Sequence, residues 1–232
     1  MKTNRLLAVA SALLFSVSLV FAQGGPGQLQ ELLTAVGISM ALSKQNLAHY
    51  KWLQQTQMLK DGESKGTTVE QIQMGPDGQP IKITLSAPPP PQLKRGLRGR
   101  VQEDKIEETK QYVQQMMALA QSYMKPNPDV LKQQLQAGKA WLSPAGNLVK
   151  LKFSDVQKAG DSLTISIDTA GRQIRAIAAS SYLESPQDVI TIDSGFQSLR
   201  DGTDYMAKMT VSSPQKKLQV QVVTLDYTPT GQ

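Results

Sequence analysis

Cysteine is absent from the 232-residue chain, and histidine occurs once, as His49. The absence of cysteine excludes disulfides, thiolate catalysis and cysteine-rich zinc sites, and a single histidine excludes a metal centre that needs two. His49 would be the base of any serine–histidine–aspartate triad, yet the Gly-x-Ser-x-Gly turn that presents such a serine does not occur. Gly96 and Gly99 are followed by Arg100, without the lysine and hydroxyl residues that end a phosphate-binding loop. The sequence therefore predicts no metal, no cofactor and no catalytic residue.

Aromatic residues are also scarce, at 5% of the chain. Two pairs of aspartates, Asp188 with Asp193 and Asp201 with Asp204, are the candidates for the paired carboxylates of a glycosidase. All four stand at expected strand ends or turns, where aspartate is common for conformational reasons. Few aromatic side chains are present to stack on a sugar. We expect that the protein is not an enzyme.

The first residues are typical of a secretory signal peptide, residues 1–22. Lys2 and Arg5 precede an apolar run over residues 6–21, and the small residue Ala22 follows it, so we expect cleavage after Ala22. The alternative is a permanent membrane anchor, but the run is shorter than the ~20 residues that a bilayer span needs. An exported chain without cysteine suits the bacterial envelope. We therefore expect a periplasmic or secreted protein with no transmembrane span in the mature chain.

The positive charge of the mature chain is local. Without the signal peptide the chain has 23 basic and 19 acidic residues. The excess of four positive charges lies within residues 94–100, so the rest of the mature chain is neutral. A neutral surface argues against a nucleic-acid-binding face, and no nucleic-acid partner is expected. A cluster of four cations instead predicts contact with an anion, either a lipid phosphate or an acidic envelope partner. The four residues, which account for the whole excess, are Lys94, Arg95, Arg98 and Arg100.

Residues 87–100 form a Pro-rich basic linker. Pro88 to Pro91 favour an extended polyproline II path and cannot join a sheet ladder, so this half is a semi-rigid crossing from the strands to the next helix. Gly96 and Gly99 then loosen the cationic half. Two interpretations stay open, a stiff spacer and a hook for an anionic partner.

The spacing of apolar residues changes once in the first half of the chain. Within residues 23–49, apolar side chains recur every three or four positions, which predicts an amphipathic N-terminal helix. Residues 50–86 alternate between two faces and carry turn signals at Asp61-Gly62 and at 75–78. This pattern predicts three strands joined by two hairpins.

The second half repeats the change of spacing. Residues 101–138 return to helical spacing, with a break at Lys125-Pro126, and predict a helical insert. Residues 148–228 consist of short alternating runs between turn signals, which predict six strands in an antiparallel meander. Together the segments predict a single α+β domain over residues 23–232. Its curved antiparallel sheet, a half-barrel of about nine strands, would be covered on one face by the N-terminal helix and the insert.

The order of these elements resembles the bacterial lipoprotein-localisation (LolA/LolB-like) superfamily. The likeness covers most of the mature chain at the level of topology. Two local phrases, His49-Tyr50-x-Trp52 leading to Asp61-Gly62 and Asp201-Gly202-Thr203-x-Tyr205, look like those of secreted bacterial proteins. The resemblance implies a half-barrel sheet lidded by helices over an apolar cavity, with a lipid or a lipoprotein acyl chain as ligand.

We therefore expect a binding protein whose ligand is a lipid or another amphipathic molecule. The expected cavity lies between the apolar sheet face and the helices, where two methionine-containing helices would act as a lid. Equally open is a solid core in which these surfaces fill one another. The protein would then be an interaction module that docks an envelope partner through the basic linker or an exposed strand edge. The expected cavity residues are Trp52, Met58, Met116, Met117, Ile165 and Val220.

Overall fold

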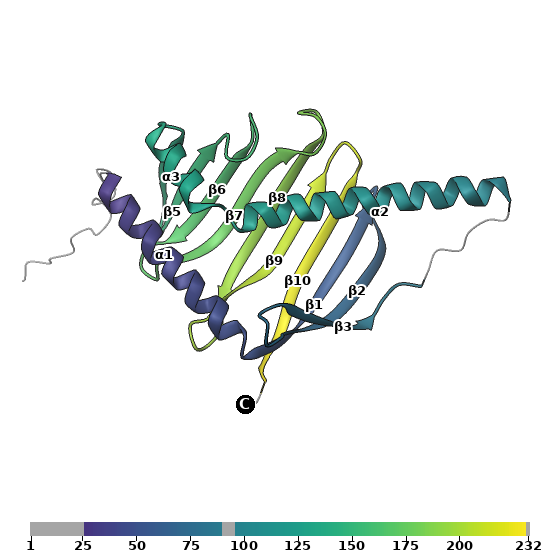
Figure 1. The fold of residues 1–232 in the computed structure, drawn as a ribbon, viewed down its shortest axis with the longest axis horizontal. Helices are drawn as coiled ribbons and strands as arrows, with labels where there is room; N and C mark the ends of the chain where they lie inside the picture. Colours follow the sequence, from purple (N-terminus) through teal and green to yellow (C-terminus); the bar gives the residue numbers. More distant parts are fainter. Residues whose placement is uncertain (1–25, 90–95, 231–232) are drawn as a thin grey trace, which may run out of the picture.

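The computed structural model describes residues 26–89 and 96–230, which form a curved antiparallel sheet with helices (Figure 1). The expected signal peptide and the cations Lys94 and Arg95 lie outside the described residues. Within the described residues there are ten strands and three helices. In chain order these are α1 (Pro26–Leu47), β1 (Tyr50–Lys60), β2 (Glu63–Met74), β3 (Pro80–Ser86), α2 (Leu97–Met124), α3 (Pro128–Gln136), β4 (Ala140–Ala145), β5 (Leu148–Ser154), β6 (Ser162–Asp168), β7 (Gln173–Tyr182), β8 (Val189–Ser198), β9 (Asp204–Ser213) and β10 (Leu218–Pro229).

All ten strands belong to one sheet, which does not close into a barrel. The strand order is β3-β2-β1-β10-β9-β8-β7-β6-β5-β4, and every neighbouring pair is antiparallel. The first strand, β1, pairs with the last, β10, so the N-terminal hairpins and the C-terminal meander form one continuous surface. This architecture confirms the predicted α+β half-barrel.

The edge strand β4 is missing from the sequence-based prediction of about nine strands. It pairs with β5 along its whole length. Trp141 and Pro144 are both exposed, so β4 lacks the alternating burial on which the prediction relies. Proline has no N–H to donate to a neighbouring strand, and it is therefore tolerated at a sheet edge. With β4 at its edge, the sheet has ten strands rather than the nine predicted.

The helix ends follow local sequence signals, except at the start of α2. That helix begins at Leu97, about one turn before the predicted residue 101, and ends at Met124 before the Lys125-Pro126 break. The side-chain oxygen of Asn127 accepts a hydrogen bond from Asp129 N–H at 2.9 Å and caps α3, as predicted. None of the three described helices is apolar enough over a sufficient length to cross a membrane.

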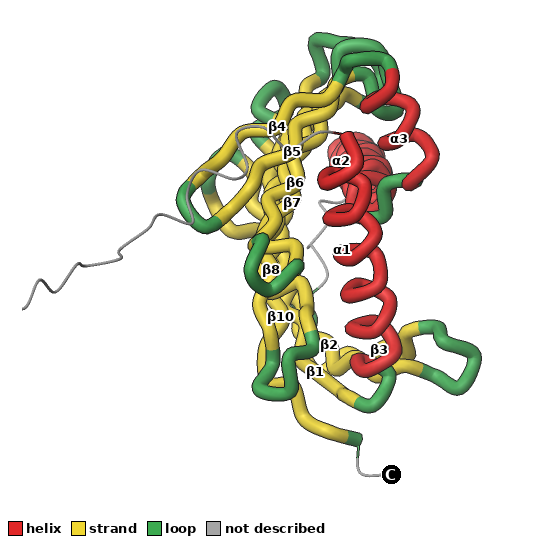
Figure 2. Tube along the Cα trace, turned by 90° about the vertical axis from the view of Figure 1, so that its left-hand side faces the viewer, coloured by secondary structure: helices red, strands yellow, loops and turns green. Residues whose placement is uncertain are grey.

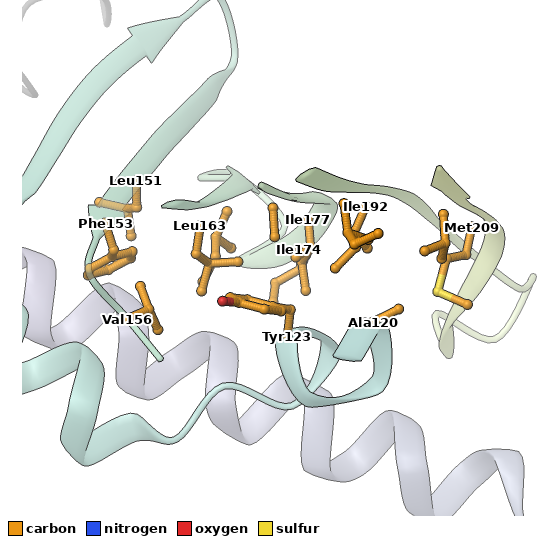
Figure 3. Packing of buried hydrophobic residues seen from close by; sticks show 14 of the residues in the cluster. Ala120, Tyr123, Leu151, Phe153, Val156, Leu163, Ile174, Ile177, Ile192 and Met209 are labelled. Carbon is orange, nitrogen blue, oxygen red and sulfur yellow. The ribbon is translucent and has the colours of Figure 1, made fainter. Parts of the chain in front are cut away.

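The core lies between the sheet and the helices, which Figure 2 shows on the same side of the sheet. The antiparallel register places apolar residues opposite one another, so that Leu151, Ile165 and Ile177 form a buried row across three strands. Figure 3 shows Ala120 and Tyr123 of α2 packed beside the side chains of these strands. Each apolar side chain that is fully buried in this way contributes about 1.5–3 kcal/mol to stability.

Two tyrosines of α2 bind the helix to loops at one end of the sheet. The Tyr112 hydroxyl donates a hydrogen bond to the Asp188 carboxylate at 2.5 Å. About three helical turns later, the buried Tyr123 hydroxyl donates to the Asp161 carboxylate and lies 3.0 Å from Ser181 Oγ. Burial raises the pKa of the Tyr123 phenol, and the hydrogen bond to Asp161 raises it further. The phenol therefore stays protonated and acts as the donor.

Asp161 also organises the loop between β5 and β6. Its carboxylate accepts hydrogen bonds from three consecutive backbone N–H groups, those of Val156 at 2.6 Å, Gln157 at 2.9 Å and Lys158 at 2.8 Å. A buried carboxylate is costly unless such donors replace its water. The contact between α2 and the sheet is thus a fully hydrogen-bonded polar cluster inside an apolar core.

The start of the Pro-rich linker packs on the sheet. Pro88 lies against Gly66 of β2, where an added Cβ atom would stand 2.7 Å from Pro88 Cγ. Gly66 is the cross-strand partner of Met58, next to an irregularity in the pairing of β1 with β2. The lack of a side chain at residue 66 therefore lets the linker approach the β2 backbone.

Candidate functional site

A pocket of about 210 Å³ lies between α1 and the sheet, and we call it the α1 pocket. Its walls come from α1, from the first two strands β1 and β2, and from the later strands β7, β8 and β9. Four of its lining residues are polar or charged: Ser43, Lys44, Asp204 and Tyr205. The other seven are apolar: Met40, Leu47, Trp52, Met74, Ile174, Phe196 and Met206.

Hydrogen bonds fix α1 over this end of the sheet. The buried Ser43 hydroxyl accepts the N–H of Asp204 at 3.0 Å. Less than one turn later, Asn46 donates to a hydroxyl in the turn between β8 and β9 at 3.2 Å. Met40 and Leu47 lie three residues before and four residues after Ser43, so they share its face of the helix. The bonds at Ser43 and Asn46 therefore set how deeply these two apolar side chains approach the strands.

An aromatic stack braces the strand wall of the α1 pocket. The ring of Trp52 stacks on the ring of Tyr227, with centroids 5.4 Å apart and an interplanar angle of 16°. The Tyr227 ring also contacts the Tyr205 ring, with centroids 4.4 Å apart. The pairing of β1 with β10 is irregular beside Trp52, and Asp226 has φ 55° there. Burial raises the pKa of Tyr227 to about 12. The stack with Tyr227 restrains the ring of Trp52. This wall of the pocket is therefore preorganised for a ligand.

The charges that line the α1 pocket are not equivalent. The Asp204 carboxylate accepts a hydrogen bond from Ser198 at 2.6 Å and lies 3.7 Å from the Arg175 guanidinium, which also approaches Asp168 at 3.6 Å. Lys44 is exposed, and it makes no ion pair or hydrogen bond with any residue that the structure describes. The carboxylate of Asp204 is therefore already neutralised, whereas the exposed Lys44 has no partner among the described residues.

Apolar side chains continue outside the pocket on α1. Ile38 and Leu42 are 58% and 54% exposed. They lie one turn apart on the helix and two residues from Met40, so they face away from the α1 pocket. They form a separate apolar surface on the exposed face of α1.

The structure does not bring the six predicted cavity residues together. Trp52 lines the α1 pocket. Met116, Ile165 and Val220 are buried side chains of the core, and Met117 packs against that core while half-buried. The sixth residue, Met58, is half-buried on β1 as the cross-strand partner of Val220.

Most residues of the α1 pocket escape the sequence-based prediction. Met40 and Leu47 belong to the apolar stripe of the predicted N-terminal helix, and this stripe is the signal that could have identified them. Met74, Phe196 and Met206 sit in separate strands and share no spacing. Phe196 and Met206 are cross-strand partners of β8 and β9, whereas Met74 reaches them only through the order of the folded sheet, in which β1 and β10 lie between β2 and β9.

The predicted cationic cluster lies elsewhere. Arg98 and Arg100 are exposed in the first turn of α2, and neither lines the α1 pocket. Figure 1 shows this end of α2 projecting beyond the strands, away from α1. Lys94 and Arg95 lie outside the described residues. The described part of the cluster is therefore a separate surface.

The candidate catalytic aspartates lie in turns or at strand ends, except Asp193. That residue is exposed inside β8, so its expected place at a strand end is wrong. Asp201 accepts the N–H of Thr203 at 2.9 Å and the hydroxyl of Tyr50 at 2.7 Å, and these hydrogen bonds lower its pKa. The Asp188 carboxylate accepts a hydrogen bond from the hydroxyl of Tyr112. The exposed His49 makes backbone contacts through its carbonyl. Among the described residues, no three His, Cys, Asp or Glu side chains gather as a metal site would require.

A second pocket, of about 360 Å³, lies between the β1–β2 turn and the β9–β10 turn. The ion pair of Lys217 with Asp61, at 3.8 Å, stands at its edge. Turn residues and polar side chains form much of its lining. The smaller α1 pocket is the better candidate for an apolar ligand because most of its lining side chains are apolar.

The sequence matches no protein-family model and no curated protein. Among solved structures, the chain is similar to a crystal structure of a DUF1329 family protein from Desulfovibrio piger, with 9% sequence identity and a TM-score of 0.36. The alignment covers 84% of this chain and 93% of that chain. Function must therefore be inferred from the residues of this chain itself.

Proposed function

We propose that this chain is an exported, non-enzymatic protein that binds the apolar part of an amphipathic ligand in the α1 pocket. A lipid or a lipoprotein acyl chain has the required chemistry. The observation that carries the proposal is the α1 pocket itself, which is lined by seven apolar residues and by the exposed Lys44, a cation that pairs with no described residue. Each methylene that leaves water for such a site contributes about 0.8 kcal/mol to binding.

Two further observations support this proposal. The expected signal peptide and the lack of cysteine favour the bacterial envelope, where amphipathic ligands are abundant. A curved sheet with helices on one face is also the arrangement that the LolA/LolB-like resemblance implies. Three of the six residues first expected to line a cavity, Met116, Ile165 and Val220, are buried in the described core, whereas Trp52 lines the α1 pocket. The proposal therefore places the ligand under α1 rather than under α2.

Native mass spectrometry of the full chain, exported by a bacterium and purified without detergent, tests the proposal. We expect a lipid-sized adduct that disappears in Leu47→Gln, which makes one pocket wall polar. The matched control is Leu142→Gln on the edge strand β4, which should keep the adduct. Circular dichroism verifies that both variants fold. An adduct that survives in both variants, or a bare chain that also fails to take up added lipid extract, contradicts the proposal.

A second candidate function is docking of an extended partner strand at the β3 edge. The observation that favours it is the exposure of the alternating residues Ile81 and Ile83, at 51% and 52%, on a strand whose outer edge pairs with no described strand. Replacement of Ile83 by Lys would abolish this docking and leave the α1 pocket unchanged. Retained capture of an envelope protein by Ile83→Lys would contradict this second function.

A further inference from the structure

The size of the α1 pocket limits what it can hold. Sites for drug-sized ligands usually measure ~300–1,000 Å³, whereas the α1 pocket measures about 210 Å³. The pocket is therefore smaller than a site for a drug-sized ligand, and it suits one medium-length alkyl chain better than the paired chains of a phospholipid.

Lys44 is the cation in the lining of the α1 pocket. The apolar walls Trp52 and Phe196 come from the sheet, whereas Lys44 lies on α1 and is exposed. The only acidic side chain of the lining, Asp204, already accepts a hydrogen bond from Ser198 and faces the Arg175 guanidinium. Lys44 has no such partner among the described residues. Its ammonium group is therefore the charge that a ligand head can pair with.

Resting on the proposed function, we infer that the α1 pocket selects a single-chain amphiphile with an anionic oxygen head. Its alkyl chain lies between Trp52 and Phe196, and its carboxylate, sulfate or phosphate pairs with Lys44. An exposed ion pair contributes modestly by itself. Selectivity over a cationic amphiphile is larger, because the same lysine then repels the head group.

Three probes with the same chain, octanoate, octanol and octylammonium, separate the two parts of this inference. The chain has two tryptophans, and Trp141 is 53% exposed on β4, so Trp141→Phe leaves Trp52 as the reporter of binding. At low salt we expect octanoate to bind about tenfold more tightly than octylammonium. Lys44→Glu should reverse this order and leave octanol binding unchanged. The control Lys150→Glu changes the net charge equally on the opposite face of the sheet and should preserve the order.

A series of alkyl carboxylates tests the size. We expect affinity to rise about fourfold for each added methylene until the chain fills the pocket near octanoate, and then to level off. A steady rise through dodecanoate would overturn the single medium-length chain. Equal affinities for the three octyl probes in both the parent and Lys44→Glu would overturn the anionic head and leave the proposed function standing. Failure of all the probes to change Trp52 fluorescence would contradict both.

Discussion

The phenol of Tyr123 donates a hydrogen bond to the carboxylate of Asp161, a side chain that is only 1% exposed. Asp161 lies in the loop between β5 and β6, and Tyr123 lies at the C-terminal end of α2, so this bond joins the helical insert to the sheet. Three backbone N–H groups complete the carboxylate's partners. The position of α2 on the core therefore depends on a polar contact as well as on apolar packing.

Removal of this hydroxyl should destabilise the protein. We expect Tyr123→Phe to lower the free energy of unfolding by ~1–3 kcal/mol, because a buried carboxylate loses one donor while the ring stays in place. Urea denaturation measures the change. The control is Tyr205→Phe, which removes an exposed bond to Gln197 and should cost less than ~0.5 kcal/mol. Equal losses in the two variants would contradict the importance of the Asp161 contact.

Tyr112 should make stability sensitive to alkaline pH. Burial, together with the hydrogen bond to Asp188, raises its pKa to about 12, whereas an unfolded tyrosine titrates near ~10. The folded state therefore holds this proton more tightly. The stabilisation is fully present below pH ~10 and is lost as the pH rises towards ~12.

Urea midpoints measured below and within this pH window test the role of Tyr112. The unfolding free energy of the parent should fall as the pH rises through the window, and Tyr112→Phe should show a shallower fall. Since Tyr123 and Tyr227 also have raised pKa values, a residual slope should remain in the variant. Identical slopes in the parent and the variant would refute the assignment to Tyr112.

Replacement of each of two glycines by alanine should change the stability of the protein in opposite directions. Gly66→Ala places a Cβ atom 2.7 Å from Pro88 Cγ, so we expect a loss of ~1–3 kcal/mol or displacement of the Pro-rich linker. Gly37 lies in α1 with no atom within 4 Å of an added Cβ, and Gly37→Ala should stabilise the helix by up to ~1 kcal/mol. Thermal unfolding reports both changes. A stabilising Gly66→Ala would show that Pro88 does not pack there.

Two adjacent methionines distinguish a solid core under α2 from a cavity. Met116 is fully buried, and Met117 is half-buried beside the same core. We expect Met116→Ala to cost ~2–5 kcal/mol, as for other core truncations, and Met117→Ala to cost clearly less. Chemical denaturation measures the difference. A negligible loss at Met116 would indicate unfilled space under α2.

The order of helices and strands could be predicted because local signals agree with the fold. Alternation of apolar residues identifies the three hairpin strands and the six strands of the meander, and Asn127 marks the start of α3. The edge strand β4 could not be predicted, because Pro144 and the exposed Trp141 remove the alternating pattern. An edge strand has one neighbour and little burial, so its sequence is weakly constrained.

The candidate site was harder to predict than the fold. Trp52 could be identified as an amphipathic aromatic residue at the start of the first strand, but its neighbours Phe196 and Met206 lie more than a hundred residues away. Their proximity depends on the pairing of β1 with β10 and on the path of α1 across the sheet. The sequence predicts Met116 as a cavity residue because it is a methionine of the helical insert. Packing of α2 on the sheet buries it in the core instead.

The location of the ligand is the central claim, and the methionine methyl groups can test it directly. Nine methionines occur in the chain, and three of them, Met40, Met74 and Met206, line the α1 pocket. In a ¹³C-methyl NMR titration with octanoate we expect these three signals to shift together. Those of the core residues Met116 and Met209 should stay unchanged. Shifts at Met116 and Met209 without shifts at the three pocket methionines would place the ligand under α2 and contradict the account.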